Sequence, residues 1–281
     1  MRLGELEFTV VKDGGFRLDG GAMFGVVPKP LWEKRMPADE RNRIGMDMNC
    51  LLIRSGGKLA LVETGAGDKM SPKLQEIYDH GKGKRLLENL AAKGVKPEQI
   101  DIVINTHLHF DHCGWNTRVV NGKLAPTFPN ATYYVQLGEL EHAKHPTERD
   151  SASYFPENFL PIEEAGQWRL LEKDAVILPG VEVIRVPGHN ADMQCVRLTG
   201  GGQTAFFFVD LVPTTAHLPY AWLMGYDLYP LTTLENKKKW IPEVAREGWL
   251  ALFAHDAKVV GAHLRVSDKG DVYVAEPVEI E

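Results

Sequence analysis

Residues 104–114 have the sequence INTHLHFDHCG, in which an apolar strand leads directly into four potential metal ligands. His107 and His109 are two positions apart, so in strand geometry both side chains project to the same side. Asp111 and His112 follow where the chain must turn, and they can face a second point nearby. A lone histidine here would more often be an ordinary core or surface residue, but four potential ligands close together indicate a metal site.

Three later residues resemble this cluster in their placement, because each one also follows an apolar strand. His189 follows the sequence VIRVPG, Asp210 follows FFFV and His255 follows LALFA. Taken singly, Asp210 could be a helix cap and His255 a polar strand end. Ligands held at strand ends are rigidly placed, which favours the joint interpretation. The predicted metal ligands are therefore His107, His109, Asp111, His112, His189, Asp210 and His255.

The remaining sequence alternates short apolar runs with helical patterns, which is typical of a layered α/β protein. The runs at 102–104 and 206–209 are too apolar to have one wet face, so we expect central strands with helices above and below the sheet. The expected strands are 5–11, 49–54, 58–62, 101–106, 132–135, 181–186, 204–209, 250–254 and 259–266.

Two helices have clear end signals. Ser71 can cap a helix that ends before Gly81, and Thr232 and Glu235 have the spacing of a capping box for a helix over 232–247. Pro242 is expected to kink or divide the second helix. The Gly- and Pro-bearing stretch 14–47 is too irregular for a simple connection. We therefore expect one domain over 1–281, with 14–47 as an irregular amino-terminal arm or cover.

Composition excludes several classes of protein. The formal net charge is −6, which argues against a nucleic-acid or anionic-membrane surface. Lys237 begins a run of three lysines, which we interpret as the solvated face of a helix. We find no secretion signal and no apolar stretch of membrane-spanning length. The three cysteines form no CxxC pair, so a disulfide framework is not expected and a cytoplasmic location is predicted.

The order HLHFDH, Gly188-His189, Val209-Asp210 and His255 resembles the ligand series of the metallo-β-lactamase superfamily. This resemblance implies an αββα sandwich, in which two mixed β-sheets lie face to face between helices and the site lies along one edge. Glu63-Thr64-Gly65 resembles the family's Asp-Thr-Gly turn with Glu in place of Asp, so we place it outside the ligand set.

The resemblance also implies two divalent metal ions, of which zinc is expected and iron, manganese or cobalt are alternatives with the same ligand types. Asp210 would bridge the two ions. One ion would bind His107, His109 and His189, and the other would bind Asp111, His112 and His255. Such a pair lowers the pKa of a shared water and polarises a carbonyl or phosphoryl oxygen. Asp111 is the expected catalytic residue that orients this water and moves its proton. The expected activity is hydrolysis.

The substrate is indicated by further likenesses. The segments 19–29, 210–217 and 221–227 resemble those of quorum-quenching lactonases that open N-acyl homoserine lactones. Some lactonases have a tyrosine three residues after the bridging aspartate, where this chain has Pro213, so His217 is expected to supply that hydrogen bond to substrate. The residues expected to contact an acyl chain are Met23, Phe24, Trp222 and Met224.

Other activities stay open at this point. An organophosphate or aryl-ester hydrolase would use the same site, and a catalytically silent metal-binding module is a third interpretation. Asp210 disfavours a class B β-lactamase, and the 26 residues after His255 leave no room for the helical domain of glyoxalase II-type thioesterases. A persulfide dioxygenase with one iron is compatible with these ligand types. The resemblance suggests a homodimer, in which the arm covers its own or a neighbouring site.

Overall fold

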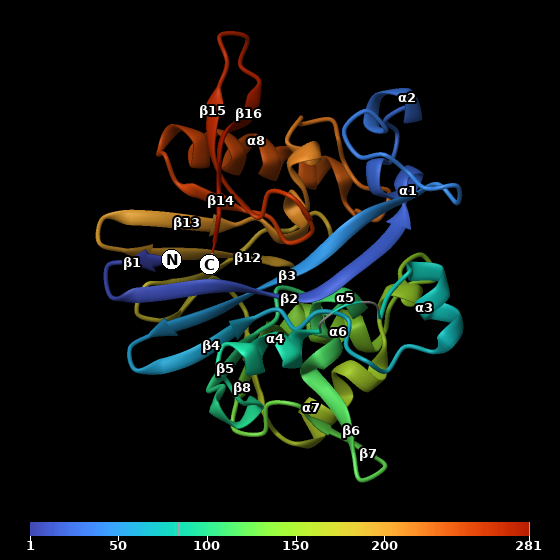
Figure 1. Ribbon diagram of the computed structural model, residues 1–281, viewed down its shortest axis with the longest axis vertical. Coiled ribbons are helices and arrows are strands. Elements are labelled where there is room, and N and C mark those ends of the chain that lie inside the picture. The colour runs from blue at the N-terminus through green and yellow to red at the C-terminus, as the bar shows by residue number, and fades with distance from the viewer. Residues whose placement is uncertain (82, 84, 281) are drawn as a thin grey trace.

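The computed structural model describes residues 1–81, 83 and 85–280, and it shows two β-sheets packed face to face between helices (Figure 1). The expected αββα sandwich is confirmed. The helices are α1 (Gly20–Phe24), α2 (Lys29–Trp32), α3 (Pro72–Tyr78), α4 (Leu86–Ala92), α5 (Phe110–Cys113), α6 (Leu137–Lys144), α7 (Leu160–Glu164) and α8 (Pro230–Arg246).

The first sheet has seven strands and is mixed. Its strands are antiparallel from β1 to β4 and parallel from β4 through β5 and β8 to β9. In spatial order they are β1 (Arg2–Leu3), β2 (Leu6–Asp19), β3 (Arg43–Ser55), β4 (Lys58–Val62), β5 (Ile102–Ile104), β8 (Thr132–Gln136) and β9 (Trp168–Leu171).

The second sheet also has seven strands, and only its β13–β14 pair is parallel. A separate hairpin joins β6 (Thr117–Val120) to β7 (Lys123–Pro126). The second sheet comprises β10 (Ala175–Leu178), β11 (Val181–Arg185), β12 (Gln194–Gly200), β13 (Gln203–Phe207), β14 (Leu250–Leu252), β15 (Gly261–Val266) and β16 (Val272–Val278).

Strand β5 shows why the sequence specifies covered central strands. Ile102 and Ile104 point into the main core between the two sheets, whereas Val103 points to a second core under the outer helices. Leu86 and Leu90 of α4 fill that second core. Each fully buried side chain of this size contributes roughly 1.5–3 kcal/mol to stability. The strand is thus fixed from both faces, which gives a rigid base for the residues that follow it.

The expected irregular arm is shorter than 14–47. Residues 14–19 belong to β2 and residues 43–47 to β3, and these two strands pair as far as Asp19 and Arg43. The register shifts between Lys12 and Gly15, so Asp13 and Gly14 form a β-bulge within a continuous strand. Within the stretch 14–47, the residues outside the strands are 20–42, which include α1 and α2.

The structure agrees with some of the predicted helix ends and differs from others. Ser71 accepts a hydrogen bond from the Leu74 amide at 3.4 Å, as expected for the cap of α3. Helix α8 begins at Pro230, so Thr232 lies inside the helix and does not cap it. Pro242 lies within α8, and the expected division there is wrong. None of the described helices is long and apolar enough to cross a membrane.

Candidate metal centre

Seven side chains from the ends of four strands meet at one edge of the sandwich. His107 and His109 follow β5, and α5 then carries the next two residues of the motif. His189 follows β11, Asp210 follows β13 and His255 follows β14. All seven are at least nine-tenths buried, and they form three overlapping groups in which ligand atoms lie within 4.8 Å of one another. The structure thus brings together every residue of the predicted ligand set.

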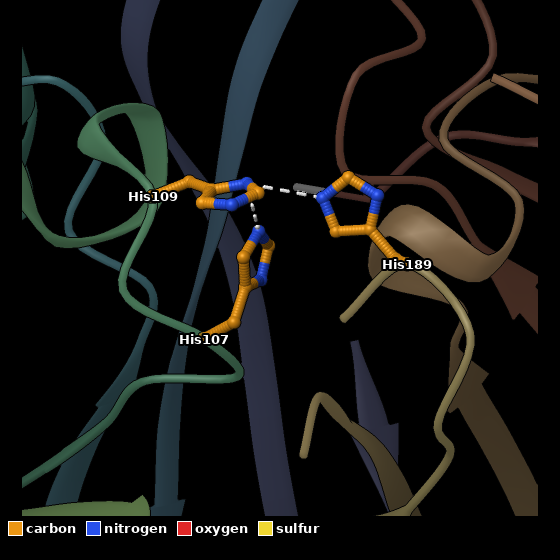
Figure 2. Close-up of side chains that lie close together, drawn as sticks. All are labelled: His107, His109 and His189. Atoms are coloured by element: carbon orange, nitrogen blue, oxygen red, sulfur yellow. Dashed lines mark hydrogen bonds between the residues drawn. The ribbon is translucent and has the colours of Figure 1, made fainter. Parts of the chain in front are cut away.

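The first group consists of three imidazoles, His107, His109 and His189. The Nδ1 atom of His109 lies 3.1 Å from His107 Nε2 and 3.0 Å from His189 Nε2. Figure 2 shows the three rings pointing toward one another from two separate segments of the chain. No carboxylate belongs to this trio, so its own three members offer only nitrogen donors.

The second group contains one carboxylate and two imidazoles. The Nε2 atoms of His112 and His255 are 3.2 Å apart. Asp111 Oδ2 lies 3.7 Å from each of them. This trio faces the first across a short gap, since the His107 and His112 ring centroids are 4.0 Å apart.

Asp210 lies between the two trios and gives one oxygen to each. Its Oδ2 is 3.4 Å from His189 Nε2, whereas its Oδ1 is 3.1 Å from His255 Nε2. The preceding Val209 has a φ of 49°, a left-handed conformation that is costly for a β-branched residue. Strain of this kind persists where the surrounding structure enforces it, and here it occurs at the residue that sets the direction of Asp210.

A glycine gives His189 its position. Gly188 has a φ of 145°, and a Cβ atom there would lie 2.5 Å from Thr233 Oγ1 and 2.7 Å from Thr233 Cα in α8. Only glycine permits this approach of the strand end to the helix. The Gly188-His189 pair is therefore required by packing as well as by the ligand pattern.

The pKa shifts of these groups show where lone pairs and negative charge are concentrated. Burial, followed by the neighbouring imidazoles, lowers the pKa of His107 and His109 well below the usual value, so both present lone pairs. Burial would also lower the pKa of His112, but carboxylates led by Asp210 outweigh it and raise that pKa well above its usual value. Asp210 Oδ1 is buried without a hydrogen-bond donor among the described residues. Converging lone pairs and a concentrated negative charge are the donor set that divalent metals require.

Three of the histidines are oriented by a partner on their outer ring nitrogen. His189 Nδ1 lies 3.1 Å from Asp227 Oδ1, and His255 Nδ1 lies 3.0 Å from the Asp47 carbonyl oxygen. His112 Nδ1 lies 3.4 Å from Glu63 Oε2, in agreement with the expected place of Glu63 outside the ligand set. Such partners fix the tautomer and the orientation of a ligand ring. Asp227 was not predicted in this role, because nothing in the sequence links it to a histidine 38 residues away.

Two further buried residues support the first trio and carry no signal in the sequence. The Tyr154 ring packs edge-on against His109, with centroids 4.8 Å apart. Its hydroxyl donates to Glu139 Oε1 at 3.1 Å, and the same oxygen accepts from the Leu108 amide at 2.8 Å. Burial raises the pKa of Glu139 to about 8. Glu139 thus holds the turn between His107 and His109.

His217 does not have the arrangement expected of a substrate ligand. Its Nδ1 pairs with Thr214 Oγ1 at 2.8 Å, and its Nε2 donates to the Met23 carbonyl oxygen at 2.9 Å. The ring is 1% exposed and stacks on Phe24, with centroids 4.5 Å apart. Burial lowers the pKa of His217 to about 3, so the imidazole is neutral. Both nitrogens are used within the protein, and the expected hydrogen bond to substrate is therefore not available.

Most of the residues expected to contact an acyl chain belong to the core. Met23 and Phe24 are 1% and 0% exposed, and Met224 is also buried with them in one hydrophobic cluster. Trp222 is half-buried and lines a cleft of about 1040 Å³ together with Met36 and other residues. None of the seven predicted ligands lines this cleft.

A group of aromatic side chains that the sequence did not reveal lies beside the predicted ligands. Phe110, which stands between His109 and Asp111, stacks on Tyr78 and Phe155 with ring centroids 4.9 Å and 5.3 Å apart. Tyr78 and Phe155 are half-buried and far from Phe110 in sequence, so only the fold reveals this aromatic group. It places apolar surface directly next to the ligand cluster.

A family model described as the metallo-β-lactamase superfamily matches residues 45–260, which is more than half of the chain and includes all seven residues. The chain belongs to the metallo-β-lactamase superfamily. The expected family and the expected class of enzyme, a hydrolase superfamily, are confirmed.

Among curated relatives, N-acyl homoserine lactonase AiiA of Bacillus thuringiensis subsp. kurstaki is 28% identical over 177 residues, or 61% of this chain. That alignment spans 62% of the relative's length. An N-acyl homoserine lactonase of Bacillus cereus is 25% identical over 236 residues, covering 76% of this chain and 83% of the relative.

Solved structures agree with the fold over nearly the whole chain. A probable metal-dependent hydrolase from Staphylococcus aureus has a TM-score of 0.89 and 29% identity, and the match covers 99% of this chain and 100% of the other. AidC, a dizinc quorum-quenching lactonase in complex with a product, has a TM-score of 0.80 at 19% identity over 100% of this chain and 97% of its own. At that identity the second likeness concerns the fold alone.

Proposed function

We propose that this chain is a hydrolase with two divalent metal ions that opens N-acyl homoserine lactones. The observation that carries the proposal is the position of Asp210, which directs one carboxylate oxygen to each of two ligand trios. A single metal site would need only one of these trios. The lactonase relatives, at 25–28% identity, favour a lactone as the substrate.

The two trios have distinct tasks in this proposal. His107, His109 and His189 would hold one cation, and Asp111, His112 and His255 would hold the other. Asp210 lies between the two trios and would serve both. When bound, such a pair polarises the substrate carbonyl and lowers the pKa of a water molecule toward neutrality. The outer partners of the histidines keep the nitrogen lone pairs directed inward.

Asp111 is the proposed catalytic residue. At 8% exposed, Asp111 is the least buried of the seven proposed ligands, and one of its oxygens faces His112 and His255. In lactone opening, the attacking water forms a bond to the carbonyl carbon and the ring ester C–O bond breaks. The proton from the water passes to the Asp111 carboxylate and then to the departing ring oxygen, which becomes the hydroxyl of the product.

The aromatic group of Tyr78, Phe110 and Phe155 is the proposed contact for the acyl chain. It adjoins Asp111 through the backbone of Phe110, and the half-buried rings of Tyr78 and Phe155 offer apolar area. This assignment replaces Met23, Phe24 and Met224, whose side chains are enclosed by other residues. A homodimer, a cytoplasmic location and zinc as the metal remain predictions.

Steady-state turnover of a substrate panel tests the function. The panel contains short- and long-chain N-acyl homoserine lactones, a phosphotriester and a nitrophenyl ester, each measured with the metal-loaded protein and with Asp111→Asn. We expect the lactones to give the highest kcat/KM and Asp111→Asn to lose that activity. Preferred turnover of the phosphotriester or aryl ester would favour the alternative hydrolase, and no turnover of any ester would favour a silent metal-binding module.

A further inference from the structure

Lys237 is a buried lysine in α8, and the site described above does not account for it. It is 1% exposed, whereas its neighbours Lys238 and Lys239 are exposed. The interpretation of the three lysines as one solvated face is therefore wrong for the first of them. Burying an ammonium group is costly unless its donors are satisfied.

The Lys237 ammonium donates to three backbone carbonyl groups of a single turn. Its Nζ lies 2.6 Å from the His217 oxygen, 2.8 Å from the Pro219 oxygen and 2.8 Å from the Trp222 oxygen. An ammonium group has three N–H donors, so this turn satisfies all of them. All three carbonyl groups can reach the same Nζ atom only while the backbone of 217–222 keeps this conformation. The three hydrogen bonds therefore stabilise that conformation.

The fixed turn leads to the outer partner of a predicted ligand. Asp227 Oδ2 accepts from the Met224 amide at 3.3 Å, and its Oδ1 pairs with His189 Nδ1 at 3.1 Å. The Leu228 amide then donates to the His189 carbonyl oxygen at 2.9 Å. The position of the carboxylate that orients His189 thus depends on the backbone between residues 222 and 228.

The same segment also anchors the amino-terminal arm. The Gly225 amide donates to the Ala22 carbonyl oxygen at 2.7 Å, and His217 donates to the carbonyl oxygen of Met23. Both acceptors lie in α1. The segment 217–227 therefore connects α1, Trp222 of the cleft and the first ligand trio. Lys237 binds this segment through three of its carbonyl groups.

We propose that Lys237 is a positioning residue, which holds the segment 217–227 in the form that places Asp227 against His189. The inference rests on the proposed metal centre for its functional consequence, but the contacts of Lys237 belong to the protein alone. The three carbonyl groups that accept from Lys237 belong to His217, Pro219 and Trp222, which are outside the proposed ligand set. Lys237 acts through these backbone carbonyl groups and Asp227.

The first test uses Lys237→Met, with Lys238→Met and Lys239→Met as matched controls on the same helix. Amide hydrogen exchange of the metal-free proteins should be faster over 217–229 in Lys237→Met and unchanged in the controls. After loading with Zn²⁺, transfer of the metal to a chelator should be roughly 10-fold faster in Lys237→Met, the lower end of the effect expected for outer partners of ligands. Exchange and transfer equal to those of the unsubstituted protein would overturn the proposal.

A double-mutant cycle tests the route through Asp227. If Lys237 acts on His189 by placing Asp227, the effects of Lys237→Met and Asp227→Asn on metal transfer should be non-additive. Additive effects would exclude this route. Should Lys237→Met not fold, Lys237→Arg and Lys237→Gln replace it, and the variant with a neutral side chain should lose metal faster than the charged one. If the unsubstituted protein binds no metal, the proposed metal centre fails, whereas the exchange measurement still decides the role of Lys237.

Discussion

The two ligand trios differ in charge. His107, His109 and His189 form a trio of imidazoles, two of which have a pKa lowered well below the usual value, burial being the first cause. The other trio includes Asp111, and its two histidines have pKa values raised by carboxylates. Asp210 serves both. The comparison teaches that the first trio has no carboxylate among its own three members and shares Asp210, whereas the second carries a carboxylate of its own.

The largest effect is therefore expected from the shared residue. Asp210→Ala should reduce kcat/KM for the preferred substrate by about 10³-fold or more, and the bound metal should fall below two equivalents per chain. The first trio should lose its metal more completely than the second. Asp271→Asn, an exposed aspartate away from the ligands, is the control and should match the unsubstituted protein. Full retention of two metals by Asp210→Ala would contradict the bridging position.

Substitutions within one trio should separate the two sites. His109→Ala removes the nitrogen on which the first trio converges, and His255→Ala removes one from the second. We expect each variant to retain about one equivalent of metal, with activity reduced by about 10²-fold or more. Elemental analysis of both proteins measures this. Loss of both metals from either variant would mean that the trios do not act as two sites.

The outer partners should give smaller effects that follow the same division. Asp227→Asn should weaken metal binding at the first trio by about 10- to 100-fold, and Glu63→Gln should do so at the second. The physical reason is that each carboxylate fixes the orientation of one ligand ring, His189 or His112. Competition with a chromophoric chelator measures the affinities. Equal affinity in both variants and the unsubstituted protein would show that these contacts do not orient the ligands.

The smallest expected effect concerns His217, a buried imidazole outside both trios. Its pKa is lowered to about 3 in the folded protein, against about 6.5 in the unfolded chain. As the pH falls, the unfolded chain therefore binds the proton before the folded protein does. Protonation of the unfolded chain lowers the free energy of unfolding by roughly 1 kcal/mol per pH unit between about pH 6.5 and 3. Urea unfolding of metal-free protein at pH 7.5 and 5.5 should show a smaller pH effect for His217→Gln. If His217→Gln had the same pH dependence of stability as the unsubstituted protein, the lowered pKa of His217 would be wrong.

The sequence predicted the convergence of the seven residues better than the contacts around them, for a physical reason. The HLHFDH motif and the strand ends before His189, Asp210 and His255 are local patterns, and strand ends at one edge bring such residues together. Contacts that depend on tertiary packing left no local trace. Asp227, Glu139 and Tyr154 are examples, since each reaches its partner through the fold.

The same limit applies to the arm and to the substrate residues. The whole stretch 14–47 was expected to be irregular, but residues 15–19 and 43–47 pair with each other as the ends of β2 and β3. Met23 and Phe24 were expected at the substrate because they are apolar and belong to the lactonase-like segment 19–29, but packing against Trp32 and His217 encloses the Phe24 ring. Burial also separated Lys237 from the two lysines after it.

The most direct test of the account is a titration of metal-free protein with Zn²⁺, followed by calorimetry. Seven converging side chains arranged as two trios around Asp210 predict saturation at two equivalents per chain, and lactone turnover that rises with occupancy. Saturation at one equivalent, or no binding at all, would contradict the proposed two-metal centre.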